Sequence, residues 1–123
     1  MAAVAAGGAL GATARFAVGR WVPWEAPAFP WATALVNVTG CLLIGLVLGW
    51  LLASTGQPAW IRPFLATGVL GGYTTFSAFA VETVVLVDSG AVVTAALYVI
   101  GSLLVGLVAV RVGATVAQLA KGA

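Results

Sequence analysis

Charged and metal-binding side chains are what this sequence has least of. Only 7% of the 123 residues are charged, histidine is absent, and Cys41 is the single cysteine. These scarcities exclude a zinc site, a Cys/His nucleophile and an internal disulfide. The five basic residues are also too scattered to follow the phosphates of a nucleic acid. A chain so poor in charge cannot cover the surface of a soluble domain.

Apolar residues make up most of the chain instead. They account for 63% of the sequence, and the mean hydropathy is +1.16, so we expect lipid to be the solvent. At roughly 20 apolar residues per crossing, the length suffices for four spans and no separate soluble domain. We predict an all-α, multi-pass protein of the cell membrane with one domain (1–123) and helices at about 2–21, 31–54, 60–87 and 91–117.

Helix-breaking residues mark the predicted connections. Pro23, Pro27 and Pro30 place the first loop, and the Asp-Ser-Gly sequence at 88–90 forms a tight turn before the last helix. Two glycines and two threonines stand within 71–75, in the middle of the third apolar segment. We therefore predict that the third helix is broken at 71–75.

The basic residues leave the orientation in the membrane weakly specified. Arg62, Arg111 and Lys121 fall towards one side of the predicted topology and Arg20 towards the other. So small a bias is compatible with insertion in both orientations. The chain also has no internal repeat, so a symmetry mate must come from a second copy.

The break and the aromatic residues after it are the first candidates for function, because polar groups at membrane depth are costly. An unwound segment frees carbonyl oxygens that can hold a cation; the alternative is a packing kink with threonine hydroxyls bonded to the backbone. Phe76 and Phe79 follow on one face, and the positive edges of their rings can contact a partly dehydrated anion. Ordinary packing is the alternative for this pair.

Other polar residues inside the predicted spans also have two interpretations. Asn37 offers two amide donors to an anion, or makes an interhelical hydrogen bond. Tyr98 and Ser102 put two hydroxyls on one helical stripe, unless the serine bonds to its own helix. Arg15 attracts anions or reaches the headgroups, and Glu82 forms a salt bridge or a protonated, hydrogen-bonded carboxyl. As a set these groups are rich in donors and poor in carboxylates, which favours an anion.

Four segments carry a family resemblance: GGALGATARF at 7–16, LVNVTG at 35–40, GVLGGYTTFSAF at 68–79, and a last helix with Tyr98 and Ser102. Together they are similar to the CrcB or Fluc family of fluoride channels. The resemblance implies an antiparallel, dual-topology homodimer with two fluoride pores and a structural sodium ion at its centre.

The resemblance also implies roles for individual residues. Gly71 and Thr74 match the positions whose backbone carbonyls hold the sodium ion. Gly106 stands where relatives can carry a second serine, and Ala78 replaces a threonine of the usual motif. The positions that match the fluoride pathway are Arg15, Asn37, Thr75, Phe76, Ser77, Phe79, Glu82, Tyr98 and Ser102.

We accordingly expect a channel, and no enzyme, that gives passive export of fluoride and so lowers fluoride toxicity in the cytoplasm. The alternative is a small proton-coupled multidrug exporter, which can have a similar length and four helices. Such exporters rely on an acidic residue in the first helix, where this chain has Arg15 and no acid.

Overall fold

The computed structural model describes residues 1–122, except for the side chain of Lys121, and this part of the chain is helical with no strand. Four segments are long and apolar enough to cross a membrane, as the sequence predicted. The third span comprises three of the elements, those over residues 63–70, 71–73 and 76–88. In chain order the elements are α1 (Ala2–Trp21), α2 (Trp31–Leu52), η1 (Pro63–Leu70), α3 (Gly71–Tyr73), α4 (Phe76–Asp88) and α5 (Val92–Gly122).

The third span is broken, and the break is shorter than the sequence predicted. Residues 71–73 are helical, and only Thr74 (φ −76°, ψ 158°) and Thr75 (φ −147°, ψ 119°) are extended. The two threonines are β-branched and tolerate extended backbone well. The two glycines before them do not unwind the helix. The stretch before α3 is a π-helix, η1, which the sequence did not indicate.

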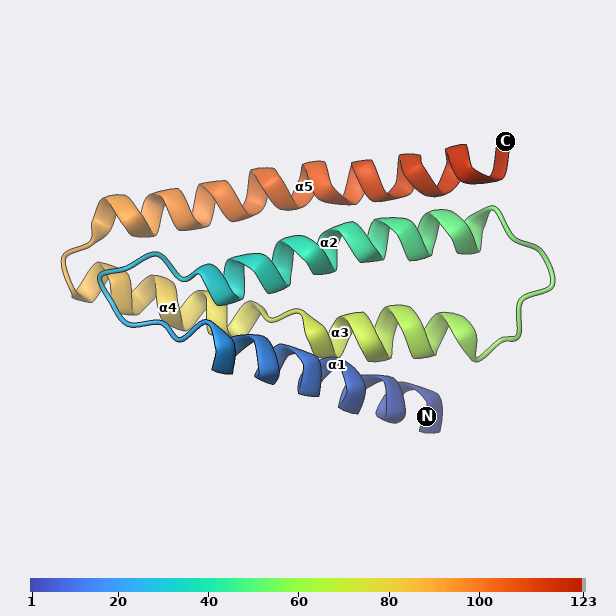
Figure 1. Cartoon of the computed structure of the whole chain (residues 1–123), viewed down its shortest axis with the longest axis horizontal. Coiled ribbons are helices and arrows are strands. Elements are labelled where there is room, and N and C mark those ends of the chain that lie inside the picture. The colour runs from blue at the N-terminus through green and yellow to red at the C-terminus, as the bar shows by residue number, and fades with distance from the viewer. Residues whose placement is uncertain (123) are drawn as a thin grey trace.

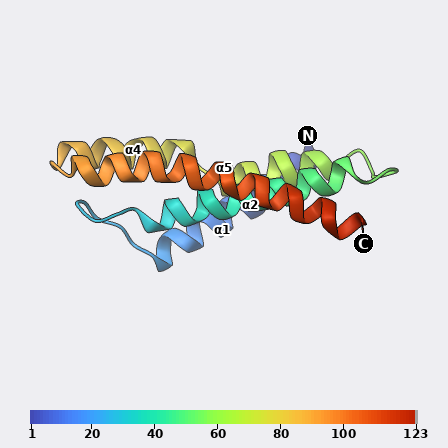
Figure 2. The ribbon, with the colours of Figure 1, turned by 90° about the horizontal axis from the view of Figure 1, so that it is seen from above.

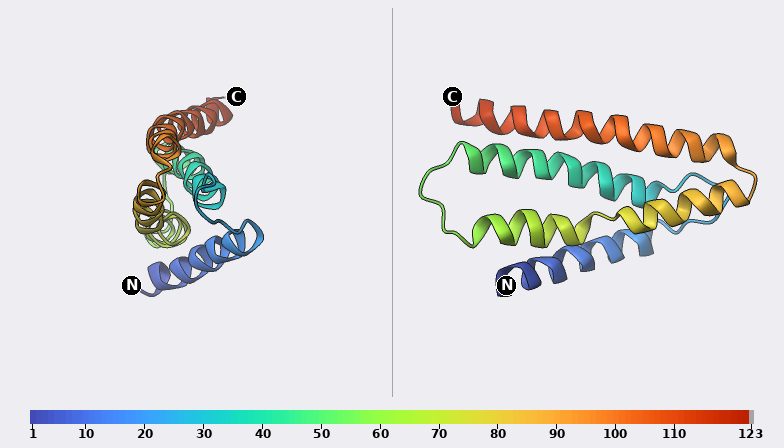
Figure 3. Two further views of the ribbon diagram at one scale, coloured as in Figure 1. Left: turned by 90° about the vertical axis from the view of Figure 1, so that its left-hand side faces the viewer. Right: turned by 180° about the vertical axis from the view of Figure 1, so that it is seen from behind.

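The four spans form a flat, elongated bundle (Figures 1 and 2). The helix α5 runs the length of the molecule beside α2, and α1 lies along η1 and α3. Seen end-on, α1 and α5 occupy opposite edges of the bundle (Figure 3, left). Both termini and the loop after α2 lie at one end, and the 22–30 loop and the α4–α5 turn lie at the other (Figure 1).

Glycines hold α1 against the third span at very short range. A Cβ atom at Gly7 would overlap the Phe64 carbonyl oxygen, and one at Gly11 would overlap that of Val69. These two glycines are spaced four residues apart, which places them on one face of α1. Because glycine has no Cβ atom, the two backbones can touch, and such close packing favours helix association in lipid.

A second glycine face joins α2 to α5. A Cβ atom at Gly45 would overlap the Val110 carbonyl, and one at Gly49 would lie 2.8 Å from the Cβ of Ala117. On the facing helix, Gly113 approaches the Leu42 carbonyl in the same way. Both close interfaces therefore rest on small residues at helical spacing.

Candidate functional site

Asn37 of α2 holds the break by two hydrogen bonds to a single residue. Its Nδ2 donates to the Thr75 carbonyl (3.0 Å), and its Oδ1 accepts from the Thr75 N–H (2.8 Å). The amide thus pairs with extended backbone as a neighbouring strand would. This arrangement satisfies both backbone polar groups of Thr75, which is only 9% exposed. One Nδ2 hydrogen of Asn37 is left over, because the amide carries two.

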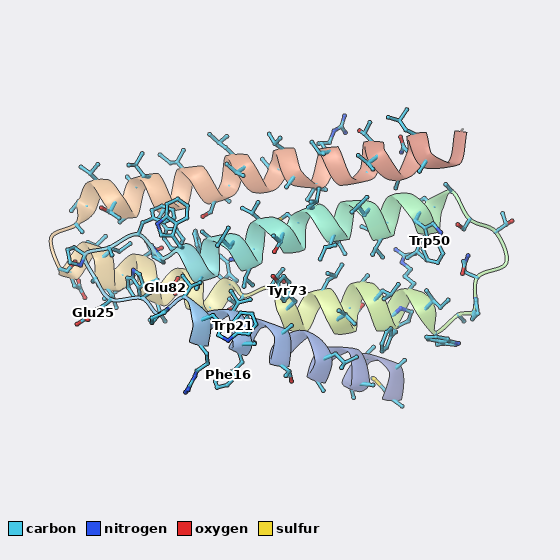
Figure 4. The ribbon with its side chains drawn as sticks, in the orientation of Figure 1. Phe16, Trp21, Glu25, Trp50, Tyr73 and Glu82 are labelled. Atoms are coloured by element: carbon cyan, nitrogen blue, oxygen red, sulfur yellow. The ribbon has the colours of Figure 1, made fainter. Side chains whose placement is uncertain are left out.

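Two further side chains fix the residues just before the break. Arg15 Nε of α1 donates to the Gly72 carbonyl at 3.1 Å. The Tyr73 hydroxyl lies 2.9 Å from Thr39 Oγ1 of α2, and Tyr73 sits near the middle of the bundle (Figure 4). The break is therefore held from two neighbouring helices, and neither Tyr73 nor Thr39 was among the predicted site residues.

The hydrogen bonds at the break redirect two amide donors. In a continuous helix the Thr75 N–H would donate to the Gly71 carbonyl, but it donates to Asn37. Likewise the Ala78 N–H, the helical donor for the Thr74 carbonyl, donates to Thr75 Oγ1 (3.2 Å). The carbonyls of Gly71 and Thr74 have therefore lost their helical donors to side chains of the site. Both residues also line the pocket described next.

A pocket of about 410 Å³ opens beside the break, between α2, the third span and α5. Phe76 and Phe79 form part of its wall with ring centroids 6.0 Å apart, and the Phe76 side chain is 81% exposed. Ser102 Oγ is buried and has no hydrogen-bond partner among the described residues. Predicted site residues in the pocket wall are Asn37, Gly71, Thr74, Thr75, Phe76, Phe79 and Ser102.

Glu82 is part of a separate hydrogen-bonded group nearer the 22–30 loop (Figure 4). Its Oε1 accepts from Thr33 Oγ1 (2.7 Å) and its Oε2 from the Tyr98 hydroxyl (2.6 Å). Tyr98 is fully buried, and its ring lies 4.9 Å from that of Phe79, centroid to centroid. Glu82 therefore accepts hydrogen bonds from hydroxyl groups on two helices. Phe79 contacts Tyr98 and also lines the pocket, so it lies between this group and the pocket.

The structure thus separates two residues that the sequence placed on one stripe. Ser102 faces the pocket and Tyr98 faces Glu82. Ser77 is exposed and its hydroxyl lies 3.2 Å from Thr75 Oγ1. Sequence reasoning missed Thr33, although it precedes Asn37 by four residues and so shares its helix face.

A smaller pocket of about 80 Å³ lies on the other side of the break. Arg15, Thr33 and Thr75 are among the residues that line it. Thr75 also lines the larger pocket, so one buried residue separates the two hollows. The extended segment therefore stands between an arginine-lined side and a phenylalanine-lined side.

This architecture defines a class: a small, four-span membrane protein with a largely apolar pocket at a broken third helix, whose wall includes a few polar side chains. The chain belongs to the family of CrcB-like proteins, whose model, described as "CrcB-like protein, Camphor Resistance (CrcB)", matches residues 2–114.

Several relatives are similar over nearly their whole length. A protein of Nitrobacter winogradskyi named "Fluoride-specific ion channel FluC" is 46% identical over 112 residues, which cover 90% of this chain and 89% of the relative. One of the same name from Rhizobium meliloti is 45% identical over 111 residues, or 89% of each protein. A third, from Paracoccus denitrificans, is 47% identical over 115 residues, or 94% of this chain and 91% of the relative.

Proposed function

We propose that this chain forms a fluoride-specific ion channel that lets fluoride leave the cell and so lowers its toxicity in the cytoplasm. The observation that carries the proposal is the pocket at the break, where the Ser102 hydroxyl and one Asn37 amide hydrogen are left without partners among the described residues, in a chain whose relatives are named fluoride-specific ion channels. No chemical step is required of the protein. A membrane potential that is negative inside drives an anion outward.

The two hollows beside Thr75 support a path for the ion. Arg15 attracts fluoride into the smaller hollow, which Thr75 also lines. Beyond Thr75 the ion meets the spare hydrogen of Asn37 Nδ2, the ring edges of Phe76 and Phe79, and the Ser102 hydroxyl. Single donors and ring edges replace water without binding the ion too tightly to let it go.

A second copy of the chain completes the pore in this proposal. Phe76 is a large apolar side chain next to the pocket and is 81% exposed in the single chain. An antiparallel partner would cover it, which agrees with the weak charge bias and the missing internal repeat. The partner and surrounding lipid would together cover the apolar outer faces of the bundle.

We also propose a structural sodium ion at the centre of that dimer. The Gly71 and Thr74 carbonyls have lost their helical donors to Asn37 and Thr75, and oxygen atoms suit a hard cation. Two antiparallel copies would bring four such oxygens around a two-fold axis. The described residues contain no group of three or more His, Cys, Asp or Glu side chains that could hold another metal.

The channel function is favoured over a proton-coupled drug exporter. The acidic residue at membrane depth, Glu82, accepts hydrogen bonds from Thr33 and Tyr98, which leaves it poorly placed to bind a drug cation. The first span carries Arg15 and no acid. The names of the relatives also describe ion channels.

Ion efflux from liposomes that contain the purified protein tests the proposal. We expect rapid loss of fluoride and negligible loss of chloride, with at least about tenfold slower fluoride loss for Phe79→Ile. Phe16→Ile is the matched control, because Phe16 is 69% exposed on α1 outside the pocket wall. Fluoride loss no faster than from empty liposomes would refute the channel.

A further inference from the structure

The last turns of α2 and the segment after them lie at the end of the bundle that carries both termini, away from the break (Figure 1). A third hollow lies between these two parts of the chain. It measures about 380 Å³ and lies between the last turns of α2 and the segment that leads into η1. Leucine side chains of α2 form its apolar side, and two polar side chains from the following segment complete it. Its wall includes Leu48, Leu51, Leu52, Gln57, Pro58 and Arg62.

Arg62 gives this groove a positive charge that no nearby carboxylate side chain balances. The chain has three acidic residues. Glu25 lies in the 22–30 loop, and Glu82 and Asp88 lie in α4, all away from the groove (Figures 1 and 4). Within the described part of the chain, Arg62 makes no salt bridge or side-chain hydrogen bond. A bound anion would therefore find an available guanidinium.

The groove also lies at a depth suited to lipid headgroups. Trp60, two residues before Arg62, is 56% exposed and packs its ring against Phe64 at 6.0 Å between centroids. Exposed indoles at the end of a span are typical of the boundary between headgroups and acyl chains. Arg62 thus lies at headgroup level, and the leucines of α2 extend from there into the apolar layer.

We propose that this groove binds a phospholipid with an anionic headgroup. The Arg62 guanidinium, aided by the Gln57 amide, binds the phosphate, and an acyl chain lies along Leu48 and Leu51. Arginine suits this role because its fork of donors matches phosphate geometry. An anionic headgroup is preferred over a zwitterionic one because this end has no acidic side chain to attract a choline group.

Native mass spectrometry of the purified full-length protein tests the site. Phosphatidylglycerol and phosphatidylcholine with the same acyl chains are added in parallel, and the bound fraction is measured. We expect phosphatidylglycerol to bind more tightly, and Arg62→Gln to weaken its binding by at least about fivefold. The matched control is Arg20→Gln, which removes the same charge from the opposite end and should bind as the wild type does.

A second pair of variants probes the apolar part of the groove without changing charge. Leu52→Trp enlarges an 82% exposed side chain in the groove wall, and Leu107→Trp enlarges a 67% exposed one on α5. We expect only Leu52→Trp to weaken phosphatidylglycerol binding, and this pair decides the question if Arg62→Gln does not fold. Equal binding of the two lipids by the wild type would overturn the site. Equal losses in Arg62→Gln and Arg20→Gln, or no loss in Leu52→Trp, would do so as well.

Discussion

The glycine interfaces and the break hold helices together in opposite ways. At Gly11 on α1 and Gly45 on α2, backbone touches backbone, and there is no room for even a Cβ atom. At the break, the helices are joined by the side chains of Arg15, Asn37 and Thr39. The glycine interfaces leave no space between the helices, whereas the break presents polar groups beside a pocket of about 410 Å³.

The difference separates folding from conduction. Lipid gives no hydrophobic drive to helix association, so close packing must supply much of the stability. Polar side chains at membrane depth cost free energy and are expected where an ion needs them. Changes at the glycine faces should therefore reduce the amount of folded protein, whereas changes at the break should reduce fluoride movement per folded protein.

The largest effect is expected from Gly11→Leu. The new side chain would meet the Val69 carbonyl and the Tyr73 N–H, which are backbone groups and cannot move aside. We expect a loss of roughly 3 kcal/mol or more in stability, seen as little monodisperse protein in detergent. Gly19→Leu, on the same helix with nothing within 4 Å of its Cβ, should be well tolerated. Equal yields of the two variants would contradict the packing account.

Asn37→Ala should have the next largest effect, on stability as well as on fluoride efflux. It leaves the Thr75 N–H and carbonyl without partners, at a cost of about 1–3 kcal/mol for each group. We expect fluoride efflux to fall at least about tenfold. Asn37→Asp keeps an acceptor for the Thr75 N–H but turns a second acceptor oxygen towards the Thr75 carbonyl and adds a negative charge, so it should be equally poor in efflux. Wild-type efflux from either variant would contradict this role.

Tyr98→Phe tests the hydrogen-bonded group around Glu82. The variant removes the hydroxyl that donates to Glu82 Oε2 at 2.6 Å inside the bundle, which should cost about 1–2 kcal/mol. Tyr73→Phe is the comparison, because Thr39 Oγ1 keeps its bond to the Leu35 carbonyl when the Tyr73 hydroxyl is lost. Thermal unfolding in detergent should show the larger loss for Tyr98→Phe, and the reverse order would count against the network.

Gly106→Ser should have the smallest effect. A Cβ atom there would lie 3.3 Å from Cys41 Sγ, with no other atom within 4 Å. A single sulfur can shift by a few tenths of an ångström, so we expect a stability change within about 1 kcal/mol. Combining Gly106→Ser with Cys41→Ala should restore the stability that Gly106→Ser alone loses. A collapse of stability in Gly106→Ser would show that this position belongs with the close glycine faces.

Much of the fold could be predicted from the sequence, because apolar runs and prolines place spans and loops directly. The assignment of Gly71 and Gly72 to the break was wrong. A Cβ atom at Gly72 would overlap the backbone of Gly8, so Gly72 serves close packing within a helix. Glycine gives the same signal for a flexible segment as for a close approach, and only the structure distinguishes the two.

The site was less predictable than the fold. Polar side chains at membrane depth cost free energy, and this identified Asn37, Glu82 and Ser102 as candidates. It did not identify their hydrogen-bond partners. The pairing of Glu82 with Tyr98, and that of Thr39 with Tyr73, depend on how the helices are rotated against each other. No spacing within one helix carries that information.

Ser102→Ala tests most directly the claim that the polar groups at the break serve the ion. Its buried hydroxyl has no partner among the described residues, so its removal should leave stability unchanged or higher. We predict a fluoride efflux rate about tenfold lower, because a hydrogen bond to a charged species is worth about 1.5–3 kcal/mol. Thr115→Val, which removes an exposed hydroxyl of α5 bonded to its own helix, is the control. Unchanged efflux from a stable Ser102→Ala protein would contradict the account.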